Sequence, residues 1–90
     1  MAIALITETP GATKEQYDQV MQESGQGDQL APGQLVHFAG PVEGGWQVVT
    51  VWESQEVADK FFNENVKPAR QKAGVQEVVP KIFPVHHLKK

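Results

Sequence analysis

The chain has 90 residues, with 8 Lys and Arg against 11 Asp and Glu, so its formal net charge is −3. This length predicts one small domain, and the acidic balance argues against a protein that binds nucleic acid through its phosphates. Because the chain has no Cys, neither disulfides nor thiolate-bound metals can supplement its core.

The apolar runs of the chain are short. The first of them, Ala2 to Ile6, is far below the roughly 20 residues of a membrane span and lacks the basic flank of a signal peptide. We therefore expect a cytoplasmic protein that makes no membrane contact.

The first predicted elements are a strand and a helix. The β-branched and apolar residues 2–7 favour a strand that stops before Pro10-Gly11. Thr13 is expected to cap the helix, because Gln16 three residues later can return a hydrogen bond to its backbone N–H. One face of this helix then carries Tyr17, Val20, Met21 and Ser24. The loop that follows contains Gly25, Gly27, Pro32 and Gly33.

A hairpin and a second helix come next. Residues 35–39 and 46–52 are predicted to pair antiparallel, since the paired glycines between them permit the positive φ of a hairpin turn. Ser54 is expected to cap the helix, Pro68 to kink or restart it, and Gly74 to end it. The apolar stripe of this helix comprises Val57, Ala58, Phe61, Phe62 and Val66.

The last predicted strand covers residues 75–85. Pro80 and Pro84 cannot donate hydrogen bonds to a neighbouring strand, so we expect an edge strand or a bulged one. With no repeat, linker or low-complexity tract, residues 1–85 are predicted to form a single domain, followed by a polar tail over 86–90.

The predicted order is β-α-β-β-α-β, which is typical of a ferredoxin-like α+β domain with a four-stranded antiparallel sheet and two helices on one face. A sheet with one wet face alternates apolar and polar residues, but these strands are apolar at both parities. Trp46, Val48 and Trp52 share one parity, and Val49 and Val51 share the other. Two helices cover only one face, so we expect a homodimer that pairs the sheet faces and buries about 1,600 Å². The pattern leaves open which parity faces the helices.

The element order and one stretch of sequence carry a family resemblance. The segment Gly45 to Ser54, leading into Phe61-Phe62 and then Pro68-Ala69-Arg70, resembles the dimeric α+β-barrel superfamily, in particular its antibiotic biosynthesis monooxygenase branch. The resemblance implies a barrel built from the sheets of two protomers, with a small-molecule pocket between each sheet and its own helices. It also implies reactions such as cofactor-independent oxygenation or cyclisation of aromatic polyketides.

The same resemblance includes a haem-degrading branch, which can be compared residue by residue. Gln71 stands where that branch has its iron-binding histidine, Ala4 where it has an asparagine, and Phe61 where it has a tryptophan. Neither Gln71 nor Ala4 can replace the original side chain. We therefore expect no haem and no other cofactor.

His37 and Tyr17 are the predicted catalytic residues. An imidazole with the unperturbed pKa of about 6.5 can remove a proton from a phenol or from a carbon next to a carbonyl, as a cyclase or cofactor-free oxygenase requires. Tyr17 can donate a hydrogen bond to the enolate oxygen that develops. Each residue has a structural alternative: His37 can donate to a backbone carbonyl, and Tyr17 can pack its ring in the core with its hydroxyl at the rim.

Aromatic side chains on several elements can wall a cavity for a flat ligand, although the same side chains can simply fill the core. Arg70 can meet an anionic substituent, although a cation in the last turns of a helix also complements the helix dipole. The predicted ligand-binding residues are Phe38, Trp46, Trp52, Phe61, Phe62 and Arg70.

No metal, nucleotide or nucleic-acid site is predicted. His86 and His87 are adjacent, so in an extended tail they face opposite ways, and no further ligand stands at suitable spacing. The glycines match neither G-x-G-x-x-G nor a phosphate-binding loop. RNA-recognition modules share the element order, but residues 45–52 lack the leading basic residue and the aromatic spacing of their RNA-binding strand.

The sequence therefore predicts an enzyme that oxygenates or cyclises an aromatic or polyketide-like compound, with His37 as base and Tyr17 as hydrogen-bond donor. The alternative is a non-catalytic protein, either a small-ligand binder or a dimeric module that only assembles. The size of the cavity discriminates between the enzyme and the non-catalytic protein. A substrate needs room for about ten heavy atoms between the helices and the sheet, so a filled interior would argue against the enzyme.

Overall fold

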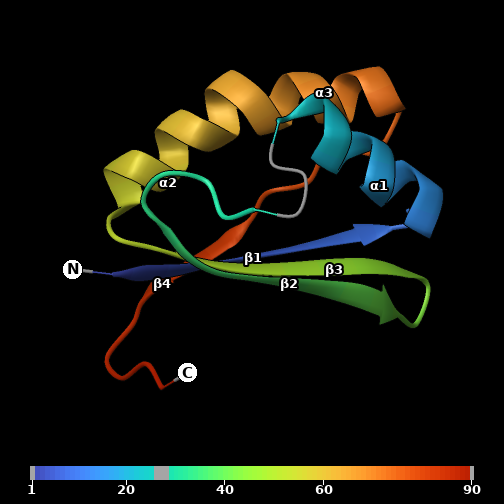
Figure 1. Cartoon of the computed structure of the whole chain (residues 1–90). Coiled ribbons are helices and arrows are strands. Elements are labelled where there is room, and N and C mark those ends of the chain that lie inside the picture. The colour runs from blue at the N-terminus through green and yellow to red at the C-terminus, as the bar shows by residue number, and fades with distance from the viewer. Residues whose placement is uncertain (1, 26–28, 90) are drawn as a thin grey trace.

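The computed structural model describes residues 2–25 and 29–89. The elements in chain order are β1 (Ile3–Pro10), α1 (Lys14–Glu23), β2 (Gln34–Val42), β3 (Gly45–Trp52), α2 (Gln55–Phe61), the π-helical turn η1 (Phe62–Val66), α3 (Lys67–Ala73) and β4 (Lys81–Pro84). The strands form one antiparallel sheet in the order β2-β3-β1-β4, and all helices lie on one face of it (Figure 1). The expected ferredoxin-like α+β arrangement is therefore confirmed.

The N-terminus of α1 has the predicted capping box. The Thr13 hydroxyl accepts from the Gln16 N–H at 3.2 Å, and the Gln16 side-chain oxygen accepts from the Thr13 N–H at 3.1 Å. Both contacts satisfy N–H groups that have no partner within the helix. Val20 is the buried residue of the helix. Of the loop that follows, Gly27 lies outside the described residues.

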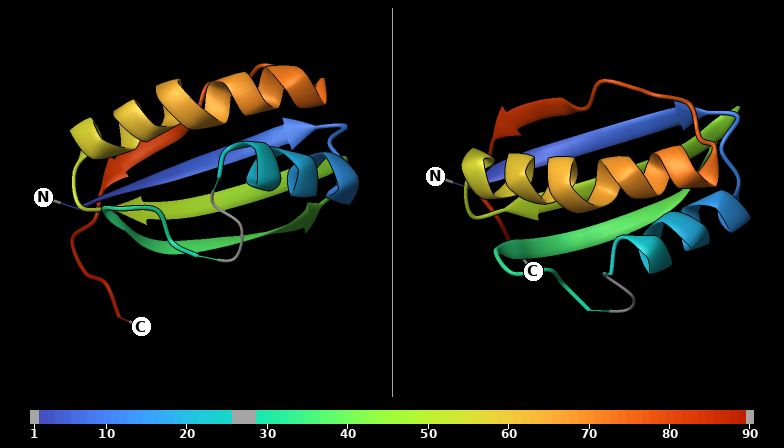
Figure 2. Two further views of the ribbon diagram at one scale, coloured as in Figure 1. Left: turned by 45° about the horizontal axis from the view of Figure 1, so that its top comes forward. Right: turned by 90° about the horizontal axis from the view of Figure 1, so that it is seen from above.

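The segments α2, η1 and α3 run on from one another as one long helix over the middle of the sheet, with α1 beside it (Figure 2). Ser54 caps it by accepting from the Val57 N–H at 3.3 Å. Pro68 stands in the first turn of α3, where its missing N–H is tolerated, and Gly74 ends the helix with φ +76°. The predicted restart and end are both confirmed. Among the described residues, none of the helices has the length and hydropathy to cross a membrane.

The predicted extent of the last strand is wrong. Only Lys81–Pro84 pairs with β1, along Ile3 to Ile6, and residues 75–80 return from α3 to the edge of the sheet without pairing. Pro80 has no N–H to offer β1, so the ladder begins after it. The edge position itself is as expected. β1 is longer than predicted because β3 pairs with it as far as Pro10.

The packing of Trp52 decides which parity faces the helices. Trp52 is 4% exposed and joins Ile3, Leu5, Ala31 and Ala58 in the core cluster, so its parity on β3 lies under the helices. The opposite parity forms the face without helices, here termed the open face. Two cross-strand rows make up its apolar part: Phe38, Val49 and Ile6, and Val36, Val51, Ala4 and Phe83.

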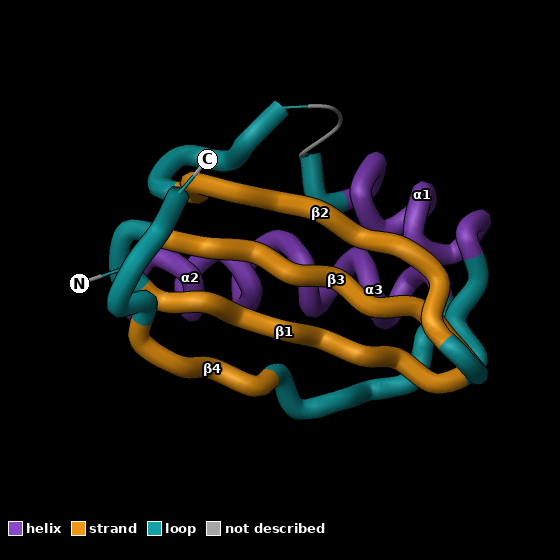
Figure 3. The backbone as a smooth tube through the Cα atoms, turned by 90° about the horizontal axis from the view of Figure 1, so that it is seen from below, coloured by secondary structure: helices purple, strands orange, loops and turns teal. Residues whose placement is uncertain are grey.

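The C-terminal tail leaves the sheet on the side of the open face. The Val85 N–H donates to the Ala2 carbonyl at 2.8 Å, and the chain then continues below the sheet (Figures 1 and 3). The helices and the tail therefore lie on opposite sides of the sheet, and the tail does not cover the space under the helices.

Candidate functional site

A cavity lies between the helices and the covered face of the sheet. The cavity volume is about 80 Å³, and the empty space reaches about 740 Å³ only when the part open to solvent is counted. Ligand cavities of proteins are mostly apolar and fall in the range of roughly 300–1,000 Å³, so a ligand of that size must extend into the open part. The walls that matter for a flat ligand are Leu5, Tyr17, Trp46, Trp52, Phe61 and Phe62.

The π-helical turn η1 keeps one face of the long helix on this cavity. Ala58, Phe62, Val66 and Arg70 are each four residues apart, and all of them line it. In a regular α-helix a four-residue step overshoots a full turn by roughly 40°, so four such residues would drift around the helix. The π-helical turn over Phe62–Val66 has more residues per turn, so it reduces the rotation of these side chains around the helix axis. The π-helical turn therefore helps to keep these four side chains directed at the cavity.

Tyr17 and His37 meet at the wall of the cavity. Tyr17 projects from α1, and its hydroxyl oxygen lies 2.7 Å from Nε2 of His37 on β2. The Tyr17 ring packs on Trp46 with 5.4 Å between ring centroids. Tyr17 lines the cavity, whereas His37 is not among the lining residues. Of the two predicted catalytic residues, Tyr17 is thus the one that a bound molecule would touch.

Gln34 supports His37 and, unlike His37, itself lines the cavity. Its side-chain nitrogen lies 3.3 Å from Nδ1 of His37, and its side-chain oxygen accepts from the Ala31 N–H at 3.0 Å. Two residues three apart on a regular strand face opposite ways, but a bulge between Gln34 and Val36 turns both side chains to the covered face. Gln34 is 5% exposed. Nothing in the sequence pattern marks this residue, because the bulge depends on pairing with β3.

Burial affects the protonation of both partners. It lowers the pKa of His37 and, together with the charge of Asp18, raises the pKa of Tyr17. Both shifts favour the neutral form. Near pH 7 the pair is therefore a neutral imidazole against a neutral phenol.

The lowered pKa of His37 predicts a loss of stability in acid. At pH values between the folded pKa and about 6.5, the unfolded chain binds more protons at this residue than the folded chain does. The free energy of unfolding is therefore expected to fall as the pH drops through about 6.5. Urea unfolding at about pH 7.5 and 5.5 measures this, and His37→Gln should reduce the difference. The control His86→Ala should not, and an unchanged difference in His37→Gln would contradict the prediction.

Arg70 lines the cavity, and its guanidinium also makes hydrogen bonds within the protein. Its guanidinium donates to the Thr9 hydroxyl at 3.0 Å and to the Gln76 carbonyl at 2.8 Å, and burial lowers its pKa. Lys72 pairs with Glu23 at 3.1 Å and lies outside the cavity lining. Arg70 is thus the basic residue of the lining, and part of its role is to tie α3 to β1.

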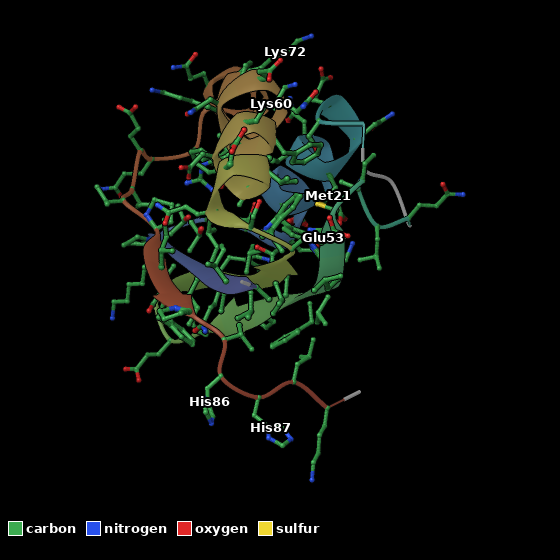
Figure 4. All side chains as sticks on the ribbon, turned by 90° about the vertical axis from the view of Figure 1, so that its left-hand side faces the viewer. Met21, Glu53, Lys60, Lys72, His86 and His87 are labelled. Carbon is green, nitrogen blue, oxygen red and sulfur yellow. The ribbon has the colours of Figure 1, made fainter. Side chains whose placement is uncertain are left out.

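Several residues singled out in the sequence lie away from the cavity. Phe38 is 60% exposed on the open face, because its position on β2 pairs it with Val49 rather than with the Trp parity. The placement of Phe38 in the ligand site therefore does not agree with the structure. His86 and His87 lie on the tail, on the far side of the sheet from the helices (Figure 4). Within residues 2–25 and 29–89, no cluster of three or more metal-ligating side chains occurs.

No family model and no curated protein matches this sequence. Three solved structures are similar in fold. A candidate antibiotic biosynthesis monooxygenase from Chloroflexus aurantiacus has a TM-score of 0.63 and 18% identity, over 99% of this chain and 98% of that one. A variant of SnoaB, a cofactor-independent oxygenase from Streptomyces nogalater, has a TM-score of 0.65 and 8% identity over 97% and 94%. A candidate antibiotic biosynthesis monooxygenase from Deinococcus radiodurans has a TM-score of 0.65 and 13% identity over 100% and 97%.

These similarities extend over whole chains at low identity, so they concern the fold. They agree with the resemblance to the dimeric α+β-barrel superfamily that the sequence suggests. The chain therefore has the ferredoxin-like α+β fold of antibiotic biosynthesis monooxygenase-like structures.

Proposed function

We propose that the protein binds a small aromatic or polyketide-like compound under its helices and promotes its cofactor-independent oxygenation or cyclisation. The observation that carries this proposal is the hydrogen-bonded Tyr17–His37 pair in the wall of an otherwise largely apolar and aromatic cavity. The similarity in fold to SnoaB, a cofactor-independent oxygenase, supports the reaction class.

Both reactions pass through an enolate or phenolate of the substrate, and the site is suited to that intermediate. A hydroxyl group directed at the developing negative oxygen stabilises it most where water is excluded, and Tyr17 is such a group. The aromatic walls orient a flat ring system and keep water away. Oxygenation of a hydroxyarene to a quinone consumes one O₂ and releases one water, with the substrate itself as the reductant.

The geometry favours a changed role for His37. Its ring lies behind Tyr17, so we assign it to the orientation and polarity of the Tyr17 hydroxyl rather than to direct removal of a substrate proton. Tyr17 is then the catalytic residue that touches substrate, His37 acts through it, and the proton that the substrate loses passes to water at the open side of the cavity.

Tyr17→Phe is expected to weaken binding of a ligand that carries a carbonyl oxygen. A buried hydrogen bond contributes about 1 kcal/mol, so the Kd of 1-indanone should rise by roughly fivefold, while the Kd of indane, which has no oxygen, should stay unchanged. Titration calorimetry or the ligand-induced rise in melting temperature measures both.

The outcomes of this experiment separate the candidate functions. An equal rise in Kd for 1-indanone and indane would contradict the assignment of Tyr17 as donor. Consumption of O₂ with 1-naphthol that depends on Tyr17 would support oxygenation. Binding of flat aromatic ligands with no turnover of hydroxyarenes or polyketide-like ketones would favour the non-catalytic small-ligand binder, and no binding at all would remove the site.

A further inference from the structure

The hydrogen bond between Tyr17 and His37 has two possible directions. If Nε2 of His37 carries no proton, Tyr17 donates to it, and the phenol can then only accept from a ligand. If Nε2 carries the proton, it donates to the Tyr17 oxygen, and the hydroxyl proton of Tyr17 is available to the cavity. The position of one proton therefore decides whether the site offers a ligand a donor or an acceptor.

Gln34 decides between these two states. The backbone N–H of Ala31 can only donate, so the side-chain atom that faces it at 3.0 Å must be the amide oxygen. The amide nitrogen then faces Nδ1 of His37 at 3.3 Å. An NH₂ group can only donate to that ring nitrogen, so Nδ1 must hold a lone pair. In a neutral imidazole the proton is then on Nε2.

The structure assigns Gln34 as a positioning residue that holds His37 in the Nε2–H form, so that Tyr17 donates its hydroxyl hydrogen to an acceptor oxygen of the ligand, such as a ketone or quinone carbonyl. The inference deepens the proposed function and rests on it for the identity of the ligand. The order of donation runs from the Ala31 N–H to Gln34, from Gln34 to His37, from His37 to Tyr17, and from Tyr17 to the ligand.

The first hydrogen bond of this series, from the Ala31 N–H to Gln34, is buried in the core. Ala31 is 9% exposed and belongs to the core cluster, and Gln34 is 5% exposed at the bulge of β2. If the Gln34 side chain no longer accepted from the Ala31 N–H, this buried backbone donor would have no partner, which costs about 1–3 kcal/mol. Rotation of the Gln34 amide by 180° would place NH₂ against N–H, and it is disfavoured for that reason.

Trp46 supports the same ligand chemistry independently. Its indole N–H is buried and has no hydrogen-bond partner among the described residues, and its ring packs against Tyr17 in the cavity lining. An indole nitrogen can only donate. An indole N–H that the described residues leave unsatisfied in the same wall is compatible with a ligand that presents acceptor oxygens.

The proton on His37 can be located directly by NMR. In long-range ¹H–¹⁵N spectra of the unmodified protein at neutral pH, Nε2 of His37 should show the shift of a protonated nitrogen and Nδ1 that of an unprotonated one. Gln34→Glu replaces the donor by a carboxylate and should move a proton onto Nδ1, whereas Gln55→Glu, which adds the same charge at an exposed helix start, should not. A proton on Nδ1 in the unmodified protein overturns the inference without any variant.

Ligand preference gives the second readout. The unmodified protein should bind 1-indanone roughly fivefold more tightly than indane. Gln34→Glu should remove most of that preference, which is read as the ratio of the two Kd values because Gln34 itself lines the cavity. A Gln34→Glu protein that shows the moved proton but keeps its preference for 1-indanone overturns the link from Gln34 to the ligand. If His37 has the Nε2–H form and neither compound binds, the role of Gln34 is supported and the proposed function fails.

Discussion

At micromolar concentration the protein is expected to sediment as a particle of twice the 9.9 kDa mass of one chain, with two open faces packed against each other. Helices cover one face of the sheet only (Figure 3). The other face carries the two cross-strand rows of apolar residues. Phe38 is 60% and Phe83 49% exposed there. Ala4 and Val51 of these rows are already buried in the single chain, at 5% and 7% exposed. For the exposed part around Phe38 and Phe83, a second copy is the self-complementary cover.

A charge on the exposed apolar part of this face should abolish the dimer. Phe38→Lys places an ammonium in each copy at the contact, where desolvation and like-charge repulsion both oppose association. Analytical ultracentrifugation should then show a folded monomer. Val79→Lys is the matched control, because Val79 is an equally apolar side chain, 92% exposed, in the segment that precedes β4. A monomeric unmodified protein, or a Phe38→Lys protein that remains dimeric, would contradict the arrangement.

Trp52→Ala is expected to lower the free energy of unfolding by about 3–5 kcal/mol, a large share of the roughly 5–15 kcal/mol that holds a small domain. Trp52 is 4% exposed, stacks on Phe61 with 5.3 Å between ring centroids, and donates its indole N–H to the Thr50 hydroxyl at 2.8 Å. Its removal leaves a void under α2 and takes one of two partners from the Thr50 hydroxyl, which still donates to the Leu5 carbonyl at 3.5 Å.

Urea unfolding followed by far-UV circular dichroism measures this loss without relying on the missing indole. Trp46→Ala is the comparison: both rings line the cavity, but Trp46 is less buried than Trp52, and its N–H has no partner among the described residues. Trp46→Ala should therefore lower the free energy of unfolding clearly less than Trp52→Ala does. Equal decreases would mean that Trp46 contributes as much to the core as Trp52.

Local signals in the sequence were sufficient for much of the fold. The pair Thr13 and Gln16 specifies a helix start through two hydrogen bonds three residues apart, and Gly74 specifies a helix end through a positive φ. Such signals act within one turn of chain, so they need no knowledge of the partner elements. The same holds for Tyr17 as a site candidate, since its place on the apolar stripe of α1 follows from helical spacing.

Contacts between residues far apart in the sequence decided which sheet face the helices cover and how the strands align. The two parities of β3 are equally apolar, so only the packing of Trp52 against α2 shows which of them the helices cover, and with it that Phe38 lies outside the site. The bulge of β2 turns Gln34 toward His37, and Pro80 delays the pairing of β4 with β1. The sequence by itself thus determined the elements and their order, which depend on neighbours along the chain. The tertiary structure decided faces, register and the hydrogen-bonded site, because each of these depends on which residues of distant strands and helices come into contact.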